Sequence, residues 1–126
     1  MLVKNTKVKK QKLHDGNEHG LYEKAIKIKG ISCECGNCYE ISISELKELG
    51  DLNKEQLEIL VAFKDVYCED VLGIEIYKTK KSLPAYYAFL DCNKCLKRYL
   101  AVVGFDEVQP SRYLVELEAI YLEKPS

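Results

Sequence analysis

The sequence predicts an α+β fold, in which an antiparallel sheet carries one main helix packed on one of its faces. Several short segments alternate apolar and polar residues with the period of two that strands show. One central segment is instead apolar at helical spacing, and two C-x2-C motifs each lie between predicted strands. We expect residues 1–126 to form a single zinc-stapled domain around one modest core.

The strands follow from the alternation. The first 20 residues are rich in lysine, and they predict either an exposed edge strand or a loose basic arm that ends in the turn signal His14-Asp15-Gly16-Asn17. The predicted strands after this turn are residues 25–31, 39–43, 73–79, 85–90, 100–103 and 112–123. The first three alternate apolar and polar residues, and the last three are rich in aliphatic and aromatic residues. The strands on either side of each C-x2-C motif are expected to pair as an antiparallel hairpin, with the cysteines at its tip.

One main helix is predicted for residues 54–67. Asn53 suits the N-cap position, and Gln56 lies three residues further on, which completes a capping-box pattern. A short helical turn is predicted just before it, at residues 44–50. Cys68, at the end of the predicted helix, is interpreted as a small core residue rather than a nucleophile.

The cysteines predict one structural zinc ion. Zinc prefers four tetrahedral ligands, and thiolates suit it well. Two C-x2-C hairpin tips that face each other supply four sulfurs, from Cys35, Cys38, Cys92 and Cys95. Cys33 is an alternative ligand in the first hairpin, although we interpret it as a spare thiol. Because four thiolates fill the coordination sphere, this zinc is expected to be structural.

The residues of the two motifs carry a resemblance. Cys35-Gly36-Asn37-Cys38 and Cys92-Asn93-Lys94-Cys95, each between predicted strands, resemble the paired knuckles of zinc-ribbon and zinc-knuckle proteins. This resemblance covers about a third of the chain, and it implies a metal and a scaffold but no activity. A knuckle often has Gly directly after its second cysteine, whereas Tyr39 and Leu96 stand there in this chain.

A catalytic role is disfavoured. The only histidines, His14 and His19, both lie in the polar N-terminal segment, and no cysteine–histidine signature accompanies them. Three acids suggest a nuclease cluster: Glu69, Asp70 and Glu75. The metal-dependent nuclease pattern wants a lysine two residues beyond the last acid, however, and that position is Tyr77. We therefore interpret the acids as surface residues.

The composition and the N-terminal sequence indicate the compartment and the source of the protein. No segment approaches the roughly 20 apolar residues that span a bilayer, and the N-terminus lacks the apolar run of a signal peptide. Six cysteines without such a signal are typical of thiolates in a reducing compartment, so we expect a cytoplasmic protein. The high Lys, Glu and Ile content favours a bacterial or phage source.

The favoured function is non-catalytic binding of another protein. The net charge of −1 conceals an acidic block at residues 31–76, with eleven acids against three lysines, between two basic flanks. Four acids share one narrow stripe of the predicted helix when it is extended to residue 69: Glu55, Glu58, Asp65 and Glu69. This ridge is the predicted contact face for a basic partner protein, as in inhibitors and immunity-type proteins.

The alternative is a nucleic-acid-binding zinc protein. Lysines in the N-terminal segment would contact phosphates: Lys7, Lys9, Lys10 and Lys12. Aromatic residues on the predicted strands would stack on bases: Tyr86, Tyr87, Phe89 and Tyr99. The negative net charge and the acidic ridge weigh against this interpretation, because both repel phosphates.

Overall fold

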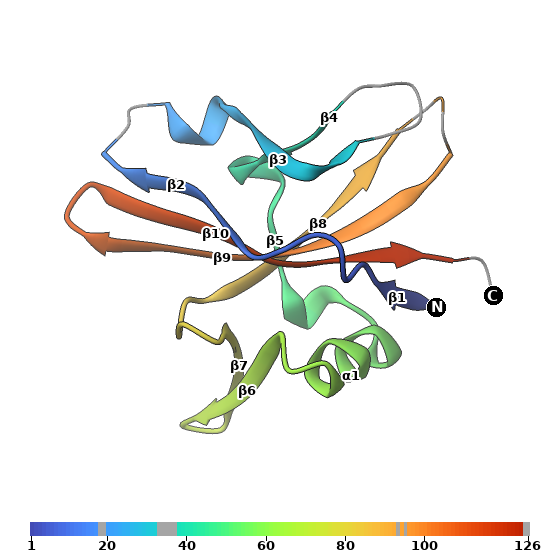
Figure 1. The fold of residues 1–126 in the computed structure, drawn as a ribbon. Helices are drawn as coiled ribbons and strands as arrows, with labels where there is room; N and C mark the ends of the chain where they lie inside the picture. The colour runs from blue at the N-terminus through green and yellow to red at the C-terminus, as the bar shows by residue number, and fades with distance from the viewer. Residues whose placement is uncertain (18–19, 33–37, 93, 95, 125–126) are drawn as a thin grey trace.

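Figure 1 shows the fold in a computed structural model, which describes residues 1–17, 20–32, 38–92, 94 and 96–124. Its strands are β1 (Leu2–Lys4), β2 (Gln11–Gly16), β3 (Ala25–Ser32), β4 (Cys38–Ser42), β5 (Lys47–Glu48), β6 (Val66–Val71), β7 (Ile74–Thr79), β8 (Ala85–Asp91), β9 (Arg98–Gln109) and β10 (Arg112–Glu123). Its helices are α1 (Lys54–Ala62) and three short 3-10 turns: η1 (Leu21–Glu23), η2 (Ile43–Glu45) and η3 (Leu49–Asp51).

The main sheet is built on the long antiparallel hairpin of β9 and β10. It has the strand order β1-β10-β9-β8-β5, and β2 pairs with β10 as well. Both N-terminal strands therefore lie along β10: β1 beside Tyr121 to Glu123 and β2 beside Leu117 to Tyr113. The N-terminal segment is thus an edge of the sheet and not a loose arm, and His14 and Asp15 belong to β2 rather than to a turn.

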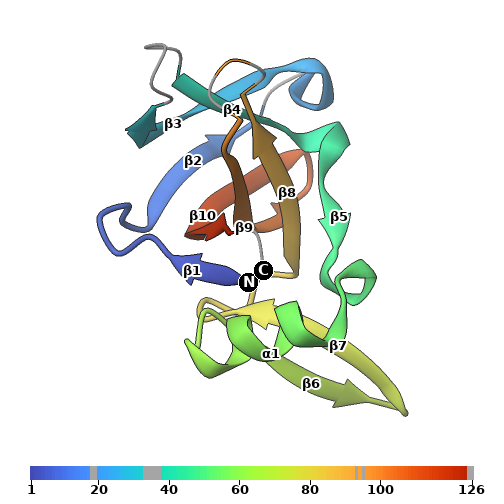
Figure 2. The ribbon, with the colours of Figure 1, turned by 90° about the vertical axis from the view of Figure 1, so that its right-hand side faces the viewer.

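Two separate layers cover the two faces of this sheet. The β3–β4 hairpin lies on one face, while α1 and the β6–β7 hairpin lie on the other (Figures 1 and 2). The side chains of β9 alternate between the two: Ala101 and Val103 join the core under β3–β4, and Leu100 and Val102 join the core under α1. Each of these four residues is completely buried. The predicted α+β class is confirmed in its broad outline: the structure is mostly antiparallel sheet with one main helix.

The sheet composition differs from the expectation. We expected both cysteine hairpins and the 73–79 strand in one sheet, but β3–β4 and β6–β7 each form a two-stranded sheet of their own. β7 pairs with β6 because Leu72 and Gly73 both have positive φ, 52° and 83°, and close a two-residue hairpin turn. The helical turn expected at residues 44–50 is replaced by η2, β5 and η3.

The main helix is shorter than expected. Its N-terminus is as predicted, because the Asn53 side chain accepts a hydrogen bond of 2.8 Å from the Gln56 amide. It ends after Ala62, where Lys64 adopts the left-handed conformation with φ 61°. The Lys64 amide then donates to Val61 O (2.9 Å) and the Asp65 amide to Leu60 O (3.2 Å), which is the Schellman pattern of hydrogen bonds. Residues 66 and 67 start β6 instead of continuing the helix.

This early end moves two of the predicted contact acids and Cys68 off the helix. Asp65 is 1% exposed, so the expectation that it lies on a solvent-facing ridge is wrong. Glu69 lies in β6, on the neighbouring hairpin. Cys68 was interpreted as a core residue, but it is exposed on β6, where every residue after Val66 is exposed.

Asp65 anchors the lower layer to the sheet. One of its carboxylate oxygens accepts a hydrogen bond from the Tyr121 hydroxyl, and the other forms an ion pair of 2.9 Å with Lys4 Nζ. Lys4 also lies 5.5 Å from the centre of the Phe63 ring. Burial and the contact with Asp65 raise the pKa of Tyr121 well above its ordinary value, so this hydroxyl keeps its proton and donates.

Removing the Tyr121 hydroxyl therefore tests this anchor. Tyr121→Phe is expected to lower the free energy of unfolding by about 2 kcal/mol, because a buried carboxylate loses a hydrogen-bond donor. Urea denaturation measures the effect, with Tyr22→Phe at an exposed ring as the control. Equal stability of the two variants would contradict the anchoring role.

Candidate metal centre and partner surface

The two cysteine motifs lie at the ends of two hairpins. Cys38 is the first residue of β4 and pairs in register with Ser32 of β3, and Cys92 directly follows β8. The Cys92 side chain is half-buried and packs against the core under β3–β4. Cys35, Cys95 and the alternative ligand Cys33 lie outside the described residues, as does the side chain of Cys38.

Tyr39, the residue after Cys38, packs on the β8–β9 hairpin near Cys92. The ring of Tyr39 packs edge-to-face on that of Tyr99 in β9, with 5.3 Å between the centres. Tyr39 also lines a hollow of about 400 Å³ together with Leu90 and Asp91, the two residues before Cys92. The ends of the two hairpins therefore lie close together (Figure 1), as one shared zinc ion requires.

The backbone after the second motif has the geometry of a tight loop. Leu96 adopts the left-handed conformation with φ 56°, and its amide donates to Cys92 O at 3.0 Å. Leucine is an uncommon residue in this conformation, and no packing compensates here, because Leu96 is 89% exposed. This is the position at which knuckles often have glycine, the residue best suited to positive φ. Tyr39, the equivalent residue of the first motif, is instead extended in β4.

The fit of a zinc ion is therefore judged from the surroundings of the motifs. Three or more potential ligands do not gather anywhere among the residues that the structure describes. Those residues do not include Cys35, Cys95 or the side chain of Cys38. The neighbouring hairpin ends and the loop after Cys92 both suit a thiolate site. The ligand set of Cys35, Cys38, Cys92 and Cys95 stays a prediction.

A second candidate site lies on the opposite face of the sheet. We call α1 together with the β6–β7 hairpin the helix–hairpin surface. Large apolar side chains are exposed along it: Val61, Phe63, Tyr67, Val71, Leu72 and Ile74. These are six of the eleven large apolar residues that are exposed in the described part of the chain, although the segment 61–74 is only a small part of it. By the register, Tyr67, Val71 and Ile74 share one face of the hairpin. Exposed apolar residues at this density favour an interaction site.

A groove runs between the helix and the hairpin. It has a volume of about 590 Å³, and its apolar walls come from α1 and the residues before it on one side and from Tyr77 of β7 on the other. Cys68 lies opposite Tyr77 in register, so the two side chains share one face of the hairpin. Burial and the neighbouring Cys68 thiol raise the pKa of Tyr77.

Exposed carboxylates lie near this groove and on the outer face of the hairpin. Glu55 and Glu58 are exposed on α1, as predicted from the sequence. Glu69 is exposed on β6, on the hairpin face away from Tyr77, and forms an ion pair of 2.9 Å with Lys78. The sequence analysis did not assign Asp70 and Glu75 to the helix–hairpin surface, yet they are paired across β6 and β7 and exposed. Only the hairpin register reveals them, because it places them on the same face as Cys68 and Tyr77.

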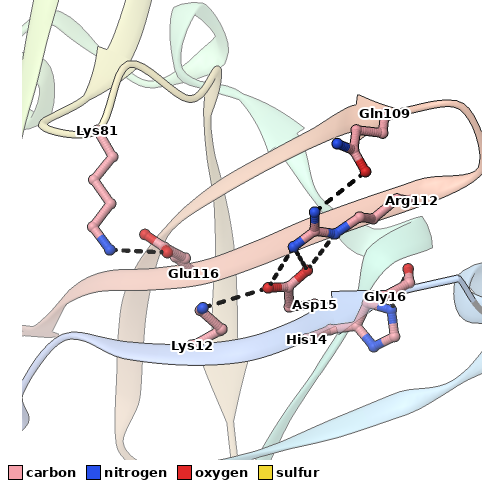
Figure 3. A network of polar contacts seen from close by, with 8 residues as sticks. All are labelled: Lys12, His14, Asp15, Gly16, Lys81, Gln109, Arg112 and Glu116. Carbon is pink, nitrogen blue, oxygen red and sulfur yellow. Dashed lines mark hydrogen bonds and ion pairs between the residues drawn. The ribbon is translucent and has the colours of Figure 1, made fainter.

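The nucleic-acid alternative receives less support. Two of its four lysines form ion pairs: Lys10 with the buried Glu118, and Lys12 with Asp15 at 3.4 Å. Figure 3 shows that Asp15 is also held by Arg112, and this contact lowers the pKa of Asp15. Of the proposed stacking aromatics, Tyr87 is buried, and Arg98 already covers the Phe89 ring at 3.9 Å.

The nuclease cluster does not form. Asp70 and Glu75 face each other across the hairpin, but Glu69 pairs with Ile76 and therefore lies on the other face. Asp70 accepts a hydrogen bond from the Gly73 amide at 2.9 Å, which is the role of an aspartate in a turn. His14 Nε2 is 3.2 Å from Gly16 O in the same strand, and His19 lies outside the described residues.

No protein-family model, no curated protein and no solved structure matches this chain. Helices long and apolar enough to cross a membrane are also absent from the part of the chain that the structure describes. The function is therefore argued from the two candidate sites themselves.

Zinc binding is testable by mass. The untagged protein, measured by native mass spectrometry, is expected to carry the excess mass of one zinc ion, which denaturation releases. The excess should vanish in Cys92→Ser/Cys95→Ser and in Cys35→Ser/Cys38→Ser, and it should persist in Cys68→Ser, whose thiol lies on the other layer. A folded, metal-free wild-type protein would contradict the site, and loss of zinc in Cys33→Ser would make Cys33 a ligand.

Proposed function

We propose that this chain is a small, non-catalytic zinc-binding protein that acts by binding another, basic protein through its helix–hairpin surface. An inhibitor or immunity-type protein would act in this manner. The observation that carries the proposal is the clustering of exposed apolar side chains in residues 61–74 beside exposed carboxylates.

Leu72 is the strongest single element of this clustering. It is 98% exposed at the tip of the β6–β7 hairpin, and its φ of 52° is unfavourable for a residue with a branched side chain. Asparagine is the residue preferred at this position of a two-residue turn before glycine. No contact within the described part of the fold stabilises leucine at this position. Leucine would be favourable there if a partner protein buried it as an apolar anchor.

The charge of the same surface sets the kind of partner. Residues 53–79, which include α1 and the whole β6–β7 hairpin, contain six acids and three lysines, and Asp65 is the only buried acid among them. A basic protein would be attracted to this surface, which speeds encounter and favours one orientation. A phosphate backbone would be repelled.

The proposed zinc has a supporting role in this function. Cys38 begins β4, and Cys92 packs against the core under β3–β4, whereas the helix–hairpin surface is on the opposite face of the main sheet (Figure 2). The metal would therefore stabilise the domain without contacting the partner.

Charge reversal tests the proposal. Wild-type protein, immobilised and exposed to a lysate of its source cells, is expected to retain a protein of basic isoelectric point. Glu55→Lys/Glu58→Lys/Glu69→Lys should weaken this binding by about tenfold or more, because attraction becomes repulsion. The matched control, Glu23→Lys/Glu40→Lys/Glu45→Lys, makes the same change of charge at exposed acids outside this surface. Equal loss in the two variants, or no loss in the first, refutes the proposal.

Leu72→Asn separates binding from folding. The variant is expected to raise the free energy of unfolding by about 1 kcal/mol, because asparagine tolerates the left-handed conformation better than leucine. Its affinity for the recovered partner should nevertheless fall roughly tenfold, as expected when an apolar anchor is lost. Calorimetric titration and urea denaturation measure the two effects. A more stable variant with unchanged affinity would remove Leu72 from the contact face.

A further inference from the structure

We propose that the groove between α1 and β7 takes one amphipathic, basic segment of the partner protein, with an apolar side chain inside the groove and a Lys or Arg at its acidic rim. This inference rests on the proposed function and deepens it, because it assigns the partner's chemistry to one cavity.

The walls of the groove select an apolar side chain. Apolar side chains line most of it: Leu52, Leu57, Val61, Ala62 and Tyr77. Leu57 and Val61 are four residues apart on α1 and thus lie on one side of the helix, facing β7 across the groove. A volume of about 590 Å³ lies within the range of sites that enclose a ligand. Water in such a groove is poorly bound, so an apolar side chain that displaces it contributes affinity.

The rim of the groove selects a cation. Glu58 and Glu75 both line it, one from α1 and one from β7, and Asp70 lies beside Glu75 on the same face of the hairpin. Lys54 is the only basic residue in the lining. Among the described residues no cation forms an ion pair with Glu58 or Glu75. A Lys or Arg of the partner would therefore meet two carboxylates at the edge of an apolar groove, and an attraction between such exposed charges weakens as salt is added.

A second copy of this chain fits the groove poorly. Its most exposed apolar element is the hairpin tip around Leu72, which carries Glu69, Asp70 and Glu75 on the adjoining strand residues. Inserting this tip would bring these carboxylates to Glu58 and Glu75 of the first copy, and like charges placed together oppose binding. The groove and its rim together point to a partner that is apolar on one side and basic on the other.

The decisive variant fills the groove without changing its charge. Ala62 is exposed at the end of α1 and lines the groove, so Ala62→Trp places an indole in the cavity. Ala25→Trp, at an exposed residue of β3 on the opposite layer, is the matched control. Glu58→Gln/Glu75→Gln is the second variant. It removes only rim charge from exposed side chains, so it leaves the fold intact even if the tryptophan does not.

The probe is a fluorescent amphipathic helical peptide of Leu and Lys, roughly 14 residues long and thus about four turns. Its matched partner replaces every Lys with Glu. Fluorescence anisotropy of the wild-type protein is expected to detect the Lys peptide and not the Glu peptide. Ala62→Trp should weaken binding by about tenfold or more, whereas Ala25→Trp should bind as wild type does. Glu58→Gln/Glu75→Gln should weaken binding and reduce its dependence on salt. Equal binding by wild type, Ala62→Trp and the double Gln variant overturns the inference.

The recovered natural partner distinguishes this inference from the proposed function. Loss of partner binding in both Ala62→Trp and the Glu55→Lys/Glu58→Lys/Glu69→Lys variant supports both. Loss only on charge reversal leaves the proposed function in place and overturns the groove as the docking site. Unchanged binding in all variants refutes the proposed function itself. A small apolar molecule that copurifies with wild type and is absent from Ala62→Trp also overturns the inference, because the groove would then hold a ligand of another class.

Discussion

The burial of both faces of the β9–β10 hairpin governs the architecture of this protein. Leu100 to Val103 are four consecutive residues without solvent exposure, and they alternate between two separate cores. A sheet of this kind needs a covering layer on each side, since neither face tolerates water. The β3–β4 hairpin provides one layer, and α1 with β6–β7 provides the other. Each layer is attached by specific contacts: Tyr39 on Tyr99 above, and the Asp65 carboxylate with Lys4 and Tyr121 below.

Local sequence patterns predicted the helix and strands better than they predicted which elements pair or pack together. The strand of residues 112–123, predicted from its Leu, Val, Ile and Tyr content, has the expected bounds, and the Asn53 cap is confirmed by its hydrogen bond. The helix end escaped prediction because the Schellman turn uses Lys64 rather than glycine, so the sequence carries no stop signal there. The pairing of β6 with β7 was not predicted for the same reason: the first turn residue is Leu72, which is not a residue typical of such turns. The burial of Asp65 depends on Lys4 and Tyr121, both far away in the sequence, and no local pattern encodes such a contact.

The candidate sites also differ in how far local sequence patterns predict them. The cysteine spacing that predicted the zinc ligands is a local signal, and the proximity of the two hairpin ends agrees with it. The contact face depends on tertiary structure, because its acids come from α1 and from the β6–β7 hairpin. The start of β6 was predicted as part of the helix, and the pairing of β6 with β7 was not predicted. Glu55 and Glu58 were correctly placed at the surface, while Asp70 and Glu75 join them only through the register of β6 and β7. A stripe drawn on a single helix therefore included Asp65, which is buried, and missed two exposed carboxylates.

The β6–β7 hairpin has exposed apolar side chains and exposed carboxylates. The apolar side chains are unfavourable in an isolated monomer, whereas both features would suit a complex. A two-stranded hairpin is marginally stable alone, and exposed apolar strands invite pairing with other copies. This hairpin nevertheless exposes Val71, Leu72 and Ile74. Its carboxylates oppose such pairing, because Glu69, Asp70 and Glu75 on one copy repel those on another while attracting a basic surface. In the proposed function, the same charges would oppose association of identical copies and select a basic partner, and the exposed apolar residues would supply the area that such a partner buries.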